Sequence, residues 1–183
     1  MVFWDQIVIR IFSVLTLIAN ALVVLYILDF IYGKIFNERI LGKLWKHFRG
    51  YVVHYVFLVS FTATFGSLIF SEVLHFTPCL LCWYQRILMY PQVLLSGLAI
   101  IRKDKRILSY LLLLSIFGAL IAGYHYYGQL NENTPLPCST LGYSASCSDR
   151  FFLQFGYITI PFMAFSAFLL IIAAWFLYER DRV

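Results

Sequence analysis

Charged residues are scarce in this sequence of 183 residues. Lys, Arg, Asp and Glu together make up 13% of the chain, and only nine residues are acidic, whereas an average soluble domain is about 25% charged. Hydrophobic residues replace the missing charge and reach 62% of the chain. This composition excludes a disordered tail, a nucleic-acid-binding module and an ordinary soluble domain. It indicates a membrane protein.

Five hydrophobic runs are long enough to cross a bilayer, which requires about 20 mostly apolar residues. They occupy residues 7–31, 51–70, 83–101, 107–127 and 157–178. The first run is not typical of a signal peptide, because no basic residue precedes Arg10 and no small-residue cleavage site follows the run. We therefore predict an all-α integral membrane protein with five transmembrane helices, the first of which is retained.

The basic residues are clustered between these runs. Eleven of the 14 lie between the first and second runs, between the third and fourth, or in the tail: Lys34, Arg39, Lys43, Lys46, Arg49, Arg102, Lys103, Lys105, Arg106, Arg180 and Arg182. Only Arg10, Arg86 and Arg150 fall on the opposite side. By the positive-inside rule, we expect the N-terminus outside and the C-terminus in the cytoplasm. The net charge of +5 then reports topology rather than a binding surface.

All four cysteines fall in the two segments that this topology places outside, residues 71–82 and 128–156. Cys79 and Cys82 form a CxxC pair where the third run begins, and Cys138 and Cys147 lie in the longer segment with eight residues between them. An even number of cysteines on one outer face is typical of a compartment that permits disulfides. The pairs are therefore candidates for redox chemistry.

The residues around the CxxC pair favour a reactive thiolate. Thr77 and Pro78 predict a helix that starts with Thr77 as its N-cap and Pro78 as its first residue. Cys79 and Cys82 would then lie in the first turn, where the helix dipole lowers a thiol pKa. Arg86 follows Cys82 by one helical turn and adds a permanent positive charge on the same face.

Non-catalytic roles for these residues stay open at this point. Arg86 could extend to the lipid headgroups instead of serving the thiolate. The CxxC pair could be a structural disulfide or half of a zinc site, although the spacing of Cys138 and Cys147 is too wide for a usual zinc knuckle. We expect no metal.

The loop around Cys138 and Cys147 is rich in Pro, Ser, Gly and Asn, which is typical of an exposed loop. A disulfide there could have the purely structural role of closing the loop. Two pairs on one face could also work in series, by thiol–disulfide exchange.

One stretch is similar to a known family. Residues 78–86 read PCLLCWYQR; two helices, a two-cysteine outer loop and the sequence ITIP at residues 158–161 follow. This arrangement resembles the bacterial DsbB family of disulfide bond formation proteins, and the short cysteine loop resembles its BdbC-type members. The resemblance covers about residues 51–180. It implies a DsbB-like antiparallel four-helix domain over residues 51–183, preceded by an additional helix and a basic cytoplasmic loop in residues 1–50.

The resemblance also implies a function. Members re-oxidise a DsbA-like thioredoxin-fold protein and pass its electrons to membrane quinone, either ubiquinone or menaquinone, in the bacterial cytoplasmic membrane. Cys79 and Cys82 match the quinone-coupled pair, with Cys82 at the quinone ring, and Arg86 matches the arginine that supports the thiolate and a quinone carbonyl. Cys138 matches the cysteine that forms the mixed disulfide with the partner, and Cys147 completes its pair. His125 falls where some relatives place a quinone-contacting histidine.

The redox chemistry agrees with a quinone acceptor. A DsbA-type partner is a strong oxidant at about −120 mV, so its electrons need a still more positive acceptor. The sequence has no haem-type CxxCH, since Trp83 follows Cys82, and no GxGxxG for a flavin or nicotinamide. Two alternatives remain: a vitamin K epoxide reductase-like enzyme, in which the loop pair precedes the CxxC, and a non-enzymatic membrane protein with structural disulfides.

Overall fold

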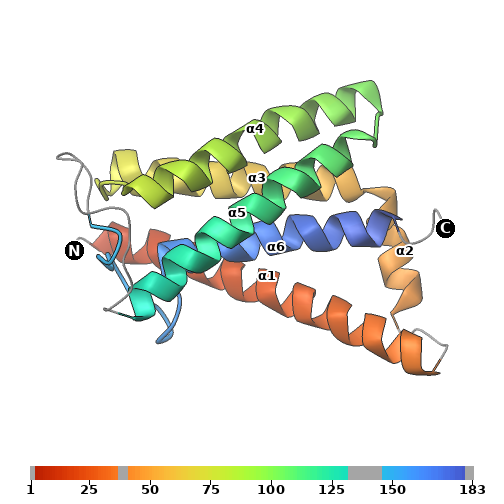
Figure 1. The fold of residues 1–183 in the computed structure, drawn as a ribbon, viewed down its shortest axis with the longest axis horizontal. Coiled ribbons are helices and arrows are strands. Elements are labelled where there is room, and N and C mark those ends of the chain that lie inside the picture. Colours follow the sequence, from red (N-terminus) through yellow and green to blue (C-terminus); the bar gives the residue numbers. More distant parts are fainter. Residues whose placement is uncertain (1–2, 37–40, 132–145, 180–183) are drawn as a thin grey trace.

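The structure is a computed structural model that describes residues 3–36, 41–131 and 146–179 (Figure 1). Over these residues the chain is helical and has no strand, apart from an isolated bridge between Gln154 and Ile158. The helices are α1 (Phe3–Phe36), α2 (Gly42–Gly50), α3 (Val52–Leu68), α4 (Leu80–Arg102), α5 (Ile107–Leu130) and α6 (Ile160–Glu179), and a short π-helical segment, η1 (Ile69–Val73), continues α3. The all-α prediction is confirmed.

Four stretches are long and apolar enough to cross a membrane. They are Trp4–Phe36, Val52–Val73, Ile107–Leu130 and Ile160–Glu179, and they coincide with four of the five predicted spans. The fifth predicted span coincides with α4, which is the least apolar of the long helices. The count of five spans therefore stays a prediction.

The last four long helices contact one another in a ring. Helix α3 packs on α4, α4 on α5, α5 on α6 and α6 on α3, while α1 packs mainly along α6. Gly118 allows α5 and α6 to approach closely, because a Cβ atom there would lie 2.3 Å from the ring of Phe168. The DsbB-like bundle in a membrane stays a prediction, but these contacts define the positions of the cysteine-bearing ends.

A buried polar contact holds α4 against α5. Ser115 donates a hydrogen bond to Oε1 of Gln92 at 3.1 Å, and Nε2 of Gln92 donates to the carbonyl oxygen of Leu88 at 3.0 Å. Such bonds between helices stabilise packing where no water competes for the polar groups. This contact joins the middle of α4 to the first half of α5.

The two ends of the molecule carry different kinds of residues. The start of α1, the connection before α4 and the segment that leads into α6 lie at one end, and α2 and the turn between α4 and α5 lie at the other (Figure 1). The described cysteines are at the first end, and the described basic residues at the end of α1, in α2 and at positions 102–106 are at the second. This separation agrees with the predicted topology; the orientation across the membrane stays a prediction.

Candidate redox site

The CxxC pair lies at the very start of α4. Cys79 is the N-cap residue, with an extended backbone (φ −77°, ψ 173°), and its carbonyl oxygen accepts a hydrogen bond from the Trp83 amide at 3.1 Å. The prediction of Thr77 as N-cap and Pro78 as the first helical residue is therefore wrong by two residues. The extended dihedrals of Cys79 exclude it from the helix, so Pro78 lies before the cap. Only Cys82 lies in the first turn.

The two sulfur atoms are in contact. Sγ of Cys79 lies 3.3 Å from Sγ of Cys82, and both cysteines are free thiols. Cys79 is buried, with 3% of its surface exposed, whereas Cys82 is half-buried. A contact of this kind allows the pair to close into a disulfide with little movement of the backbone.

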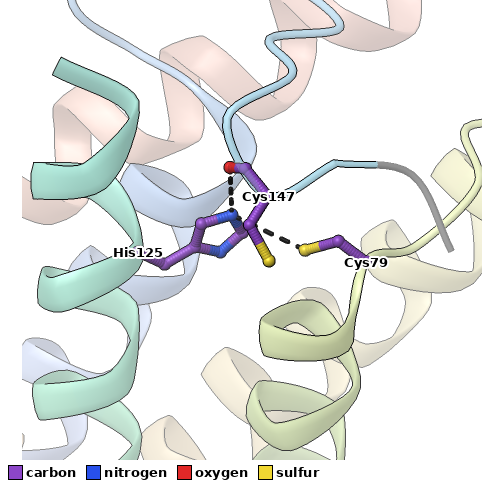
Figure 2. Close-up of side chains that lie close together, drawn as sticks. All are labelled: Cys79, His125 and Cys147. Atoms are coloured by element: carbon purple, nitrogen blue, oxygen red, sulfur yellow. Dashed lines mark hydrogen bonds between the residues drawn. The ribbon is translucent and has the colours of Figure 1, made fainter. Parts of the chain in front are cut away.

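His125, near the end of α5, lies against Cys79 (Figure 2). Its Nε2 atom is 3.6 Å from Sγ of Cys79 and 3.1 Å from the carbonyl oxygen of Cys147, and the ring is 1% exposed. Nε2 of Gln85 lies 3.0 Å from Nδ1 of the ring and also donates to the carbonyl oxygen of Leu81 at 3.1 Å. With Gln85 as donor to Nδ1, the proton of the neutral ring is on Nε2, which then faces the sulfur and the carbonyl.

These neighbours make Cys79 acidic. The hydrogen bond with the Cys82 thiol is the largest cause, and the hydrogen bond and electrostatic interaction with His125 add to it. Burial opposes them, because it disfavours a charged sulfur. Together they lower the pKa of Cys79 from its ordinary 9.0 to about 4. A reduced CxxC pair therefore holds a thiolate at Cys79 at neutral pH.

Cys147 joins this cluster from the segment that leads into α6. It is buried and disulfide-bonded, and its Sγ lies within 4.8 Å of both Sγ of Cys79 and the His125 ring. Nearby, Nε2 of Gln129 donates to the carbonyl oxygen of Asp149 at 3.0 Å, and Arg150 donates to the carbonyl oxygen of Gln129. These bonds tie the segment after Cys147 to the end of α5. Cys147 therefore lies beside the CxxC pair, whereas Cys138 lies outside the described residues.

The same three residues have the composition of a metal site. Cys79, His125 and Cys147 each present one ligand atom to a shared centre. A zinc ligand must be a thiolate, however, and the sulfur of Cys147 is already bound in a disulfide. This arrangement favours exchange between sulfur atoms over zinc binding.

Arg86 is held in place by α3. Its Nε and one terminal nitrogen donate to Oγ and to the carbonyl oxygen of Ser67, each at 3.0 Å, and its guanidinium lies 5.3 Å from the centre of the Trp83 ring. The hydroxyl of Tyr90 also donates to Ser67, at 3.2 Å. Two of the five N–H donors of Arg86 are thus used by Ser67. The half-buried side chain is thus held against α3.

A cavity of about 330 Å³ begins beside this arginine. Cys82, Gln85 and Arg86 line it from α4, and its other walls come from α1, α3, α6 and Phe70. The walls away from Arg86 are mostly apolar side chains. His125 is not among the lining residues, so the structure places it at the sulfur atoms and not in the cavity. Cys82 therefore faces the cavity, while Cys79 faces His125 and Cys147.

Sequence reasoning missed two residues of this site. Ser67 holds Arg86, and Gln85 orients His125, but neither is singled out by a motif. Gln85 could have been found, because a glutamine adjacent to Arg86 in an apolar helix needs a partner when it is buried. Ser67 gives no such signal, since a serine in a helix usually bonds to its own backbone.

The fold and the site together define a class. A helical membrane protein with a CxxC pair, whose Cys79 is buried and acidic and lies within 4.8 Å of the sulfur of a disulfide-bonded cysteine, is built for thiol–disulfide exchange. The family model described as "Disulfide bond formation protein DsbB" matches residues 49–178. The chain belongs to the DsbB family, as the resemblance predicts, and it is a disulfide-forming membrane protein. This membership decides against the vitamin K epoxide reductase-like alternative.

Relatives from Bacillus agree with this assignment. The chain is 46% identical over 130 residues to "Disulfide bond formation protein C" of Bacillus subtilis (strain 168), which covers 68% of this chain and 90% of the relative. It is 43% identical over 123 residues to "Probable disulfide formation protein C 1" of Bacillus anthracis, with coverage of 67% and 88%. No solved structure matches the chain. Oxidoreductase activity follows from the family, and α1 lies outside the matched residues.

Proposed function

We propose that this protein is a dithiol:quinone oxidoreductase, which re-oxidises a DsbA-like thioredoxin-fold protein on the outer face of the bacterial cytoplasmic membrane. One observation carries the proposal. The Cys79–Cys82 pair lies between a disulfide-bonded cysteine, with sulfur atoms within 4.8 Å, and a cavity lined by Cys82 and Arg86. A pair in that position can receive electrons on one side and deliver them on the other.

The residues of the cavity fit a quinone. A quinone ring presents carbonyl oxygens, which accept hydrogen bonds, and Arg86 is the charged donor that lines the cavity. The apolar walls suit a lipid-soluble molecule that arrives through the bilayer. We propose that Arg86 holds a quinone carbonyl next to Cys82. When bound, the quinone supplies the acceptor for the two electrons and two protons that the dithiol gives up as it closes to a disulfide.

The exchange steps conserve the number of disulfides. A thiolate of the reduced partner attacks Cys138, which breaks the Cys138–Cys147 bond and releases Cys147 as a thiolate. Cys147 then attacks Cys79 in the oxidised CxxC pair, so that a Cys79–Cys147 disulfide forms and Cys82 is released. The second thiol of the partner resolves its bond to Cys138, and the partner leaves oxidised.

The last exchange restores the loop disulfide. The freed Cys138 attacks Cys147, which breaks the Cys79–Cys147 bond and leaves Cys79 and Cys82 reduced. The structure has the same combination of redox states, with Cys147 disulfide-bonded and Cys79 and Cys82 free. Its acidic Cys79 is a good leaving group in this step, because a thiol of low pKa leaves faster.

His125 has a positioning role in this scheme. Its Nε2–H faces both Sγ of Cys79 and the carbonyl oxygen of Cys147, so it can stabilise negative charge on Cys79 and hold the second segment close. We therefore propose that His125 supports the sulfur exchange. Its expected contact with quinone has no support from the cavity, which it does not line.

A reconstituted assay tests the function. Purified protein, a reduced thioredoxin-fold dithiol protein and either ubiquinone or menaquinone are mixed, and the loss of quinone absorbance is followed. We expect catalytic turnover that requires quinone and that Cys82→Ser abolishes, while Cys138→Ser blocks transfer from the partner. A rate that is independent of quinone, or that Cys82→Ser leaves unchanged, contradicts the proposal.

A further inference from the structure

Helix α1 forms one wall of the cavity beside Arg86, although it lies outside the residues that the DsbB family model matches. Phe12, Thr16 and Leu22 are among the residues that it contributes. The hydroxyl of Thr16 donates to the carbonyl oxygen of Phe12 at 2.8 Å, so this polar group is satisfied within the helix. The wall that α1 presents to the cavity is consequently apolar.

Close contacts hold α1 in this position. Gly66 of α3 accommodates Phe12, because a Cβ atom on Gly66 would lie 2.5 Å from Cε1 of the Phe12 ring. The Phe12 ring also meets the Phe70 ring edge-on at 5.4 Å, and Ile9 is completely buried in a cluster with Phe70 and Phe152. Helix α1 is therefore fitted to α3 and to the outer segments, and it is not a loosely attached anchor.

A second cavity, of about 120 Å³, adjoins the first. The two share the lining residues Leu22, Val59 and Leu170, from α1, α3 and α6. The second is lined by apolar and aromatic side chains and reaches Tyr26 and Trp45, whose rings meet edge-on at 5.3 Å. From Phe12 to Tyr26 the two cavities follow α1 for about 21 Å, at about 1.5 Å per residue.

We propose that these adjoining cavities hold the isoprenoid tail of the quinone, and that α1 encloses the tail against α3 and α6. This inference rests on the proposed function. The charged end of the path is at Arg86, next to Cys82, and the remaining path is mostly apolar, which matches a polar ring joined to a long hydrocarbon. A tail buried here leaves the lipid phase, and every methylene group that packs against protein adds to affinity.

The residues that line both cavities give a sharp test. Leu22→Trp puts a larger side chain where both cavities meet, and Leu25→Trp is the matched control, because Leu25 is 47% exposed and lines neither cavity. Long-tailed quinone is extracted from each purified variant and quantified, and the KM is measured for the long-tailed quinone and for the same ring without a tail. Leu170→Phe, from the opposite wall, repeats the test in case Leu22→Trp does not fold.

We expect Leu22→Trp and Leu170→Phe to lose bound long-tailed quinone and to raise its KM at least about tenfold. A change of this size corresponds to about two methylene groups of the tail that are no longer buried. The KM for the tail-less ring should stay within about twofold of wild type. The inference is overturned if the variants retain the long-tailed quinone, or if KM rises equally for both quinones. It is also overturned if the variants lose co-purified phospholipid while they keep the quinone. A wild-type protein that oxidises no dithiol with either quinone contradicts the proposed function itself.

Discussion

Nε2 of His125 lies 3.6 Å from Sγ of Cys79, so a ring at the end of α5 contacts the sulfur at the start of α4. The contact is buried on both sides, since Cys79 is 3% exposed and His125 is 1% exposed. It joins two residues 46 positions apart in the chain. The acidity of Cys79 thus depends on the packing of α5 against α4 as well as on the CxxC motif.

The first prediction concerns pH. The folded pKa of Cys79, about 4, lies below its ordinary 9.0, so folding stabilises the thiolate. That stabilisation of the reduced protein is complete above about pH 9 and is lost as the pH falls through about 4. We expect the ultraviolet absorbance of the thiolate to titrate near pH 4 and to vanish in Cys79→Ser.

His125→Leu should move this midpoint to higher pH, because it removes one of the groups that stabilise the thiolate. His47→Leu is the control, since His47 is exposed on α2, at the other end of the molecule. A midpoint that stays near pH 4 in His125→Leu would show that Cys82 alone accounts for the acidity.

The second prediction concerns the distance between the cysteine pairs. Cys82→Ser combined with Cys138→Ser leaves Cys79 and Cys147, whose sulfur atoms lie within 4.8 Å. We expect mild oxidation to join them, since a small movement brings them to the disulfide distance of about 2.05 Å. Mass spectrometry of a digest without reductant detects the linked peptides.

The matched control keeps the other cysteine of the CxxC pair. Cys79→Ser with Cys138→Ser leaves Cys82, which faces the cavity with Arg86, together with Cys147. This variant should form the cross-link more slowly. Equal yields from both variants would contradict the assignment of Cys79 as the residue that exchanges with Cys147.

The sequence alone predicts most of this site but not its internal arrangement. Composition and charge clusters predict the helices and the end at which the cysteines lie, because hydropathy and the positions of Lys and Arg are local properties. The CxxC motif and Arg86 are likewise visible as a short pattern. The contacts of Gln85 with His125 and of Ser67 with Arg86 depend on which helices pack together, and no spacing in the chain specifies them.

The first helix shows the same limit. Its hydropathy predicts a membrane span but gives no sign that Phe12 packs on Gly66 or that Leu22 lines a cavity. The family pattern does not help either, because the matched residues begin at 49. A cavity wall built from ordinary apolar residues can be seen only in the structure.

The third prediction concerns the close approach of α5 and α6. Gly118→Ala places a methyl group 2.3 Å from the ring of Phe168, which is completely buried. We expect a loss of about 1–3 kcal/mol in the free energy of unfolding, the usual cost of overpacking. Thermal denaturation in detergent measures it. Gly97→Ala is the control, because the nearest atom of Phe57 would lie at an ordinary 3.5 Å. Equal melting temperatures for the two variants would refute the close approach.

The fourth prediction concerns Arg86, and it separates geometry from charge. Arg86→Lys keeps the positive charge but loses the planar group that bonds twice to Ser67 and lies over Trp83. A hydrogen bond to a charged group contributes about 1.5–3 kcal/mol, so misplacing the donor should raise the KM for quinone about tenfold or more. The turnover at saturating quinone should change less, because Cys79 keeps its contacts with Cys82 and His125. Arg102→Lys, at the far end of the same helix, should leave the KM unchanged. An Arg86→Lys protein with wild-type KM would show that a positive charge is sufficient at this position and that its attachment to Ser67 has no part in binding.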